Sequence, residues 1–179
     1  MLKRLPAPQA ILQVYAVIAV MFSGWTLTAF LWKLSAWLLL LTVGEILTVF
    51  SYAMVTNLLE SLVVLFILLT ACALLPAHML HDEFVVRGTI LSMGFIGSLM
   101  AFVGLQMQFG IESVFKLFIG PLMVLLLTAF VLRFSSKSRF ARFIHPAVLW
   151  VSDRLVVFLF ILAPLFVILL VYVIFRNLA

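Results

Sequence analysis

Long runs of apolar residues, separated by short polar breaks, dominate the sequence. Polar residues or prolines mark these breaks, as Lys33, Asn57 and Pro76 do in the first half of the chain. A helix needs about 20 apolar residues to cross the hydrocarbon core of a bilayer. Six stretches meet this requirement, at residues 10–32, 35–56, 58–75, 89–107, 111–132 and 148–175.

These runs predict helices rather than strands. Residues 38–41 are four consecutive leucines and residues 62–69 are all apolar, whereas the strands of a membrane β-barrel alternate apolar and polar residues. Backbone N–H and C=O groups in hydrocarbon must be satisfied within the protein, which only helices and closed barrels achieve. We therefore predict an all-α fold, a polytopic transmembrane helix bundle with about six spans, formed by a single integral membrane domain over residues 1–179.

Residues 10–75 leave the number of spans open. Three helices fit into this segment only with very tight turns at Lys33 and Asn57. Five spans, with one of the segments lying flat or re-entrant, is the alternative. The first run follows the basic residues Lys3 and Arg4, as a signal peptide would. It is longer than the usual apolar region of 7–15 residues, so we interpret it as a retained helix.

Composition supports the membrane interpretation. Hydrophobic residues make up 67% of the 179 residues and charged residues only 9%. A soluble domain has roughly 45–50% apolar and about 25% charged residues. A small soluble domain leaves much of its surface in water, so it could not bury this much apolar surface. We expect the lipid bilayer as partner and no nucleic acid, because the net charge of +5 suits loops at a membrane surface.

Basic residues set the expected orientation. Segment 133–142 contains four basic residues and no acid: Arg133, Lys137, Arg139 and Arg142. We expect it to be cytoplasmic and to contact lipid headgroups. Six spans then place both termini outside, whereas Lys3 and Arg4 favour an N-terminus inside. Two spans before Pro76 would remove this conflict; our working prediction keeps six spans in a bacterial cytoplasmic (inner) membrane, which the compact design suggests.

A polar stripe runs along the predicted helix 35–56. Its members are three or four residues apart and share one helix face: Thr42, Glu45, Thr48, Tyr52 and Thr56. Glu45 is expected near the middle of the bilayer, where an ionisable residue often marks a transport route. The alternative is that the stripe holds helices together through hydrogen bonds.

Small residues form a second pattern, in the predicted helix 89–107. They repeat every three or four positions: Gly94, Gly97, Ala101 and Gly104. Small residues at this spacing let another helix approach closely. The pattern predicts a packing face, either within the molecule or against another subunit.

The residues offer no familiar catalytic site. His78 and His81 with Asp82 and Glu83 are the one potential metal cluster, and we interpret them as an interfacial loop. We expect no metal, no cofactor and no catalytic residues, which argues against an enzyme. The sequence favours a non-catalytic accessory or structural membrane subunit, which packs against other membrane subunits or itself. A small carrier or channel using the Glu45 stripe, a membrane anchor of a larger system and a lipid-handling enzyme are the alternatives.

Overall fold

The computed structural model describes residues 6–74, 80, 83–109, 120, 122, 126 and 139–178. Within these residues four helices are long and apolar enough to span a membrane. They are α1 (Pro8–Leu40), α2 (Val43–Leu74), α4 (Phe84–Phe109) and α6 (Arg139–Leu178). The all-α fold is thus confirmed, with helices that are compatible with a membrane protein, but the described part of the chain has fewer candidate spans than the predicted six. Nearly all of the predicted span 111–132 lies outside it.

One span of the difference arises in the first half of the chain, where two long helices replace the three that the sequence predicts. α1 continues through Lys33, whose side chain is exposed, and α2 continues through Asn57. Asn57 does not break α2, because its side-chain oxygen accepts a hydrogen bond from the Thr26 hydroxyl of α1 at 2.8 Å. A polar side chain satisfied by a neighbouring helix can lie within a span.

The turn between α1 and α2 lies at Leu41 and Thr42, where a capping box starts α2. The Thr42 backbone N–H donates to Glu45 Oε2 at 2.8 Å, and the Glu45 backbone N–H donates to Thr42 Oγ1 at 3.4 Å. This reciprocal pair satisfies N–H groups at the start of a helix, and the carboxylate also suits the positive end of the helix dipole. Glu45 therefore lies in the first turn of α2, not near the middle of a span as predicted.

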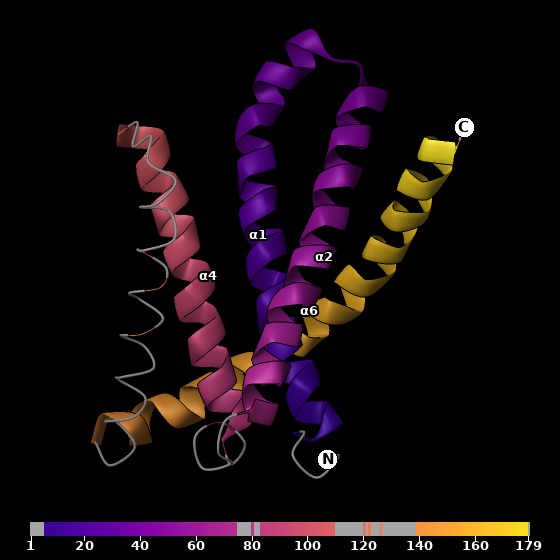
Figure 1. The fold of residues 1–179 in the computed structure, drawn as a ribbon. Helices are drawn as coiled ribbons and strands as arrows, with labels where there is room; N and C mark the ends of the chain where they lie inside the picture. Colours follow the sequence, from indigo (N-terminus) through magenta and orange to yellow (C-terminus); the bar gives the residue numbers. More distant parts are fainter. Residues whose placement is uncertain are drawn as a thin grey trace.

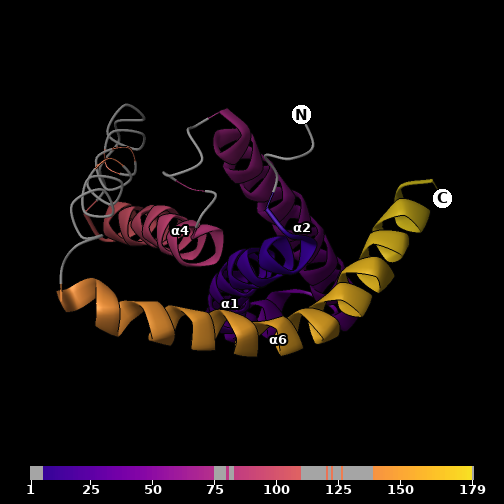
Figure 2. The same ribbon diagram turned by 90° about the horizontal axis from the view of Figure 1, so that it is seen from below.

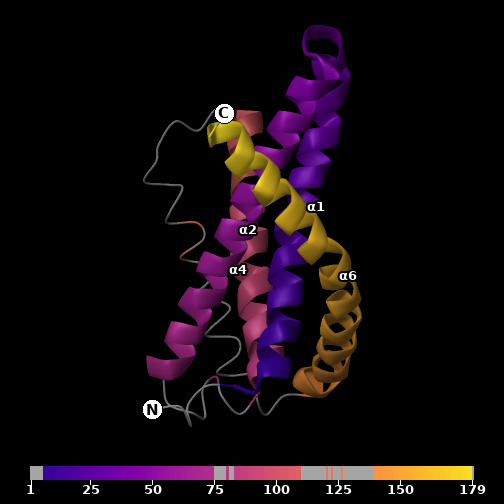
Figure 3. The ribbon, with the colours of Figure 1, turned by 90° about the vertical axis from the view of Figure 1, so that its right-hand side faces the viewer.

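The helices run up and down between two ends of the molecule (Figure 1). The start of α1, the end of α2 and the starts of α4 and α6 form one end, called the basal end here. The α1–α2 turn, the end of α4 and the end of α6 form the distal end. The described chain thus begins at the basal end and finishes at the distal end, as the side view also shows (Figure 3).

α6 is a curved helix that passes α4, α1 and α2 in turn (Figure 2). Pro146 and Pro164 lie inside it. A proline inside a helix removes a backbone hydrogen bond and its ring clashes with the preceding turn, so the helix bends. The bend lets one helix pack against three others.

Two apolar cores hold the helices together. In the basal core, Val14 and Ile18 of α1 pack with Leu68 of α2 and with Phe84 and Ile96 of α4. The approach of α4 is close: a Cβ atom at Gly88 would lie 3.3 Å from Leu68 and 3.4 Å from Val14.

The other core joins α2 to α6. Met54 and Val55 of α2 pack against Phe166, Leu169 and Val173. The second half of α6 is thereby fixed along α2, next to the predicted polar stripe.

Candidate functional site

The polar stripe on α2 reaches α6 at two positions. Thr48 Oγ1 lies 3.0 Å from the Tyr172 hydroxyl, and the Tyr52 hydroxyl donates to Asn177 Oδ1 at 2.8 Å. The Thr48 hydroxyl also donates to the backbone oxygen of Gly44 at 2.8 Å. A hydroxyl has one proton to donate, so Tyr172 is the donor to Thr48. Both contacts join residues more than 120 positions apart in the sequence.

The other stripe residues have local partners. The Thr56 hydroxyl donates to the backbone oxygen of Tyr52 in its own helix at 3.0 Å. Thr42 and Glu45 belong to the capping box, with a further bond of 2.9 Å between the Thr42 hydroxyl and Glu45 Oε2. The structure therefore divides the stripe into a helix cap at the distal end and a pair of bonds between α2 and α6.

A second set of polar contacts, which the sequence did not predict, lies nearer the basal end. Tyr15 of α1 lies 3.4 Å from Ser61 of α2, hydroxyl to hydroxyl, and the Gln13 side-chain amide donates to Asp153 of α6 at 3.4 Å. Together with the Thr26–Asn57 bond they join α1 to α2 and α6. The sequence signal for these contacts is a single polar residue inside an apolar run. Asn57 is interpreted above as a break between helices, and no role is assigned there to the other residues.

Three buried hydroxyls, of Ser23, Thr89 and Ser92, have no hydrogen-bond partner among the described residues. Ser23 belongs to α1, and the other two belong to one face of α4. A buried polar group without a partner costs about 1–3 kcal/mol relative to a satisfied one. These positions therefore weaken the bundle.

The small-residue face of α4 is open at its centre. A Cβ atom added to Gly97 or to Gly104 would meet no atom within 4 Å, and Ala101 between them is exposed. Gly94, a turn closer to the basal end, is half-buried. Within the described residues, the face is therefore unpacked at Gly97 and Gly104.

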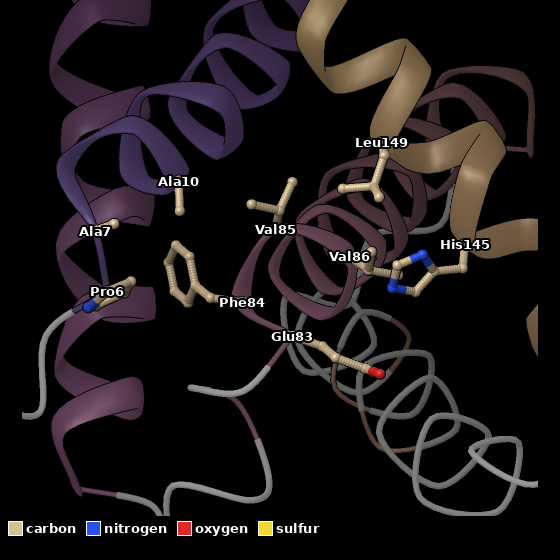
Figure 4. Close-up of a pocket in the computed structure, with 9 residues that line it drawn as sticks. All are labelled: Pro6, Ala7, Ala10, Glu83, Phe84, Val85, Val86, His145 and Leu149. Carbon is tan, nitrogen blue, oxygen red and sulfur yellow. The ribbon is translucent and has the colours of Figure 1, made fainter.

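An open pocket of about 540 Å³ lies at the basal end, between the starts of α1, α4 and α6 (Figure 4). Its lining comes from three segments of the chain: Pro6, Ala7, Ala10, Glu83, Phe84, Val85, Val86, His145 and Leu149. Most of this wall is apolar, and the carboxylate of Glu83 and the imidazole of His145 are its ionisable groups. Such a wall suits an amphipathic ligand.

The Glu83 carboxylate is paired with Arg87, one turn further along α4. Glu83 Oε2 accepts from both Nε and Nη2 of Arg87 at 3.1 Å. No hydrogen bond or ion pair within the described residues uses the other carboxylate oxygen, Oε1. The pocket thus has a free acceptor on one wall, next to a guanidinium group.

The predicted headgroup residues lie partly at the same end. Arg139 and Arg142 belong to the first turns of α6, whereas Arg133 and Lys137 lie outside the described residues. Further along α6, the Arg154 guanidinium lies 5.6 Å from the ring centroid of Trp150, whose side chain is 63% exposed. An exposed tryptophan stacked with a cation is typical of a membrane interface.

No group of three potential metal ligands occurs among the described residues. Three members of the potential metal cluster, His78, His81 and Asp82, lie outside the described residues.

The described residues thus form four apolar helices, joined in places by polar contacts, that are compatible with an α-helical membrane protein. Comparisons with protein families, with curated proteins and with solved structures found no match for this chain. No relative therefore supplies an activity, a substrate or a partner.

Proposed function

We propose that this chain is a non-catalytic accessory subunit of a membrane assembly, and that α4 is its docking face for a transmembrane helix of a partner subunit. The open space at Gly97 and Gly104 is the observation that carries the proposal. Lipid tails are as apolar as leucine, so helices associate in bilayers through close packing at small residues. A face of small, regularly spaced residues that the described helices leave unpacked suits the approach of a second helix.

Polar and aromatic landmarks support a position for the bilayer. On α1 the rise from Gln13 to Trp32 is about 28 Å, at 1.5 Å per residue. This value matches the hydrocarbon thickness of about 30 Å. The path along the curved helix α6 from Arg154 to Arg176 is about 33 Å, long enough for an inclined helix to cross most of that thickness. We place the basal boundary near Gln13 and Arg154 and the distal boundary near Trp32 and Arg176, so Gly97 lies within the bilayer.

The charge distribution supports a cytoplasmic basal end. Arg87, Arg139, Arg142 and Arg154 belong to basal segments of α4 and α6, and Lys3 and Arg4 precede the start of α1. Among the described residues, the distal end has Lys33 and Arg176. Cytoplasmic ends carry the excess of Lys and Arg. In this topology the N-terminus and segment 133–142 share the cytoplasmic side, which removes the conflict in the sequence, and the C-terminus lies outside.

The contacts of the α2 stripe also support packing. The hydroxyls of Thr48 and Tyr52 are bonded to α6, so they are not free to bind a passing ion or polar substrate. The Glu45 carboxylate caps α2 at the distal end, so the proposed bilayer position puts it away from the middle of the bilayer.

Substitution of Gly97 by leucine tests the docking face. Gly97→Leu would fill the space that a partner helix needs. Gly24→Leu is the matched control, because Gly24 is also a helical glycine whose Cβ would meet no atom within 4 Å. We expect the wild type and Gly24→Leu to purify in mild detergent with a stoichiometric partner, and Gly97→Leu to lose it, as measured by light scattering and mass spectrometry. A wild type that purifies alone as a monomer would contradict the proposal, as would a partner retained by Gly97→Leu.

A further inference from the structure

We infer that the basal pocket is a binding site for one phosphatidylethanolamine molecule, with the lipid ammonium group on Glu83. The site differs from the docking face on α4, and no part of the accessory function requires it. The inference rests on the membrane boundaries proposed above and on the chemistry of the pocket wall.

The pocket lies at the height of the lipid headgroups. Ala7 and Ala10 precede Gln13 on α1, and His145 and Leu149 precede Arg154 on α6. Each pair is within about two to three turns of the proposed basal boundary, on its cytoplasmic side. A pocket at this height is accessible from the membrane surface. Phospholipid headgroups are the most abundant candidate ligands there.

The wall matches an amphipathic molecule. Figure 4 shows the Phe84 ring beside Ala7 and Ala10, and Leu149 pointing down from α6. Together with Val85, these side chains form an apolar surface on which the glycerol backbone and the start of an acyl chain can lie. The volume of about 540 Å³ is within the range of small-molecule sites and far below that of a whole lipid. The remainder of the acyl chains would stay in the bilayer.

The charged groups select the headgroup. Glu83 Oε1 is an unused acceptor, and a primary ammonium group has three N–H donors for it. Arg87 bonds to Oε2 of the same carboxylate and does not belong to the pocket lining, so Oε1 is the oxygen left for the ammonium group. The imidazole of His145 can donate to the phosphate from α6. A carboxylate and an imidazole in one pocket thus match a zwitterionic headgroup with N–H donors, and phosphatidylcholine has no such donors.

Competition between three lipids tests the inference. Delipidated full-length protein is incubated with equimolar phosphatidylethanolamine, phosphatidylcholine and phosphatidylglycerol, and bound lipid is counted by native mass spectrometry. One charge-assisted hydrogen bond corresponds to about a tenfold preference. We expect that preference for phosphatidylethanolamine over phosphatidylcholine in the wild type and its loss in Glu83→Gln. Asp153→Asn, which removes an exposed carboxylate of α6 outside the pocket and keeps an acceptor for Gln13, should retain it.

A second variant tests the pocket itself. Ala7→Trp places a large ring in the pocket from an exposed position at the start of α1, so the fold should tolerate it. We expect it to reduce bound phosphatidylethanolamine at least fivefold. Equal binding of phosphatidylethanolamine and phosphatidylcholine would overturn the inference. A preference for phosphatidylglycerol would do the same, because basic residues alone would then select the lipid.

Discussion

The bonds between α2 and α6 allow a quantitative test of whether the polar stripe is packing. We expect a double-mutant cycle of Thr48→Val and Tyr172→Phe to give a coupling free energy of about 0.6 kcal/mol, with an upper bound of about 1.7 kcal/mol, as for hydrogen bonds between membrane helices. The contact of 3.0 Å is a normal hydroxyl pair, and Tyr172 is its donor. Thr48→Val should cost more than the coupling, because it leaves the Tyr172 hydroxyl without its acceptor. Tyr172→Phe should cost less than Thr48→Val, because the Thr48 hydroxyl keeps its bond to the Gly44 oxygen.

The assay is reversible unfolding in mixed micelles, followed by circular dichroism. A coupling of 0.6 kcal/mol is close to a threefold change in the folding constant, so replicate curves must resolve about 0.3 kcal/mol. Thr70→Val is the control, because the Thr70 hydroxyl donates to Phe66 in its own helix. It should show no coupling to Tyr172→Phe. A coupling of zero at Thr48 would refute the packing role and return the stripe to a solvated route.

Further predictions concern the cap and the basal core. Thr42→Ala should lower the free energy of unfolding by about 1 kcal/mol, and Thr42→Ser should retain most of it, because the cap needs a side-chain oxygen. An unchanged free energy of unfolding in Thr42→Ala would exclude a stabilising role for the cap. Ile18→Ala should cost about 2–5 kcal/mol, because Ile18 is fully buried between α1, α2 and α4. The control Leu27→Ala removes an exposed side chain and should cost far less, and equal costs would contradict the placement of the core.

The spans that could be predicted from the sequence are those flanked by polar segments. The predicted helices 89–107 and 148–175 lie within α4 and α6, and the structure extends both. The error at residues 10–75 has a physical cause. Lys33 and Asn57 were interpreted as breaks, but a helix ends where its backbone is capped, and the capping box of Thr42 and Glu45 was readable as T-x-x-E.

The candidate site was less predictable than the fold. Helical spacing placed Thr48 and Tyr52 on one face, but their partners Tyr172 and Asn177 lie more than 120 residues away. Hydrophobic periodicity contains no information about such pairings, because it describes one helix at a time. The basal pocket could not be predicted for the same reason, because its walls come from three helix starts that meet only in the folded chain.

The topology is tested most directly by the labelling of single cysteines from each side of oriented membrane vesicles, in a Cys72→Ser background. Gln9, Thr42 and Leu178 are exposed positions at the basal end, at the α1–α2 turn and at the end of α6. A cysteine at Gln9 should react only from the cytoplasmic side, and cysteines at Thr42 and Leu178 only from the opposite side. Reaction of Gln9 and Leu178 from the same side would contradict the arrangement of helices described here.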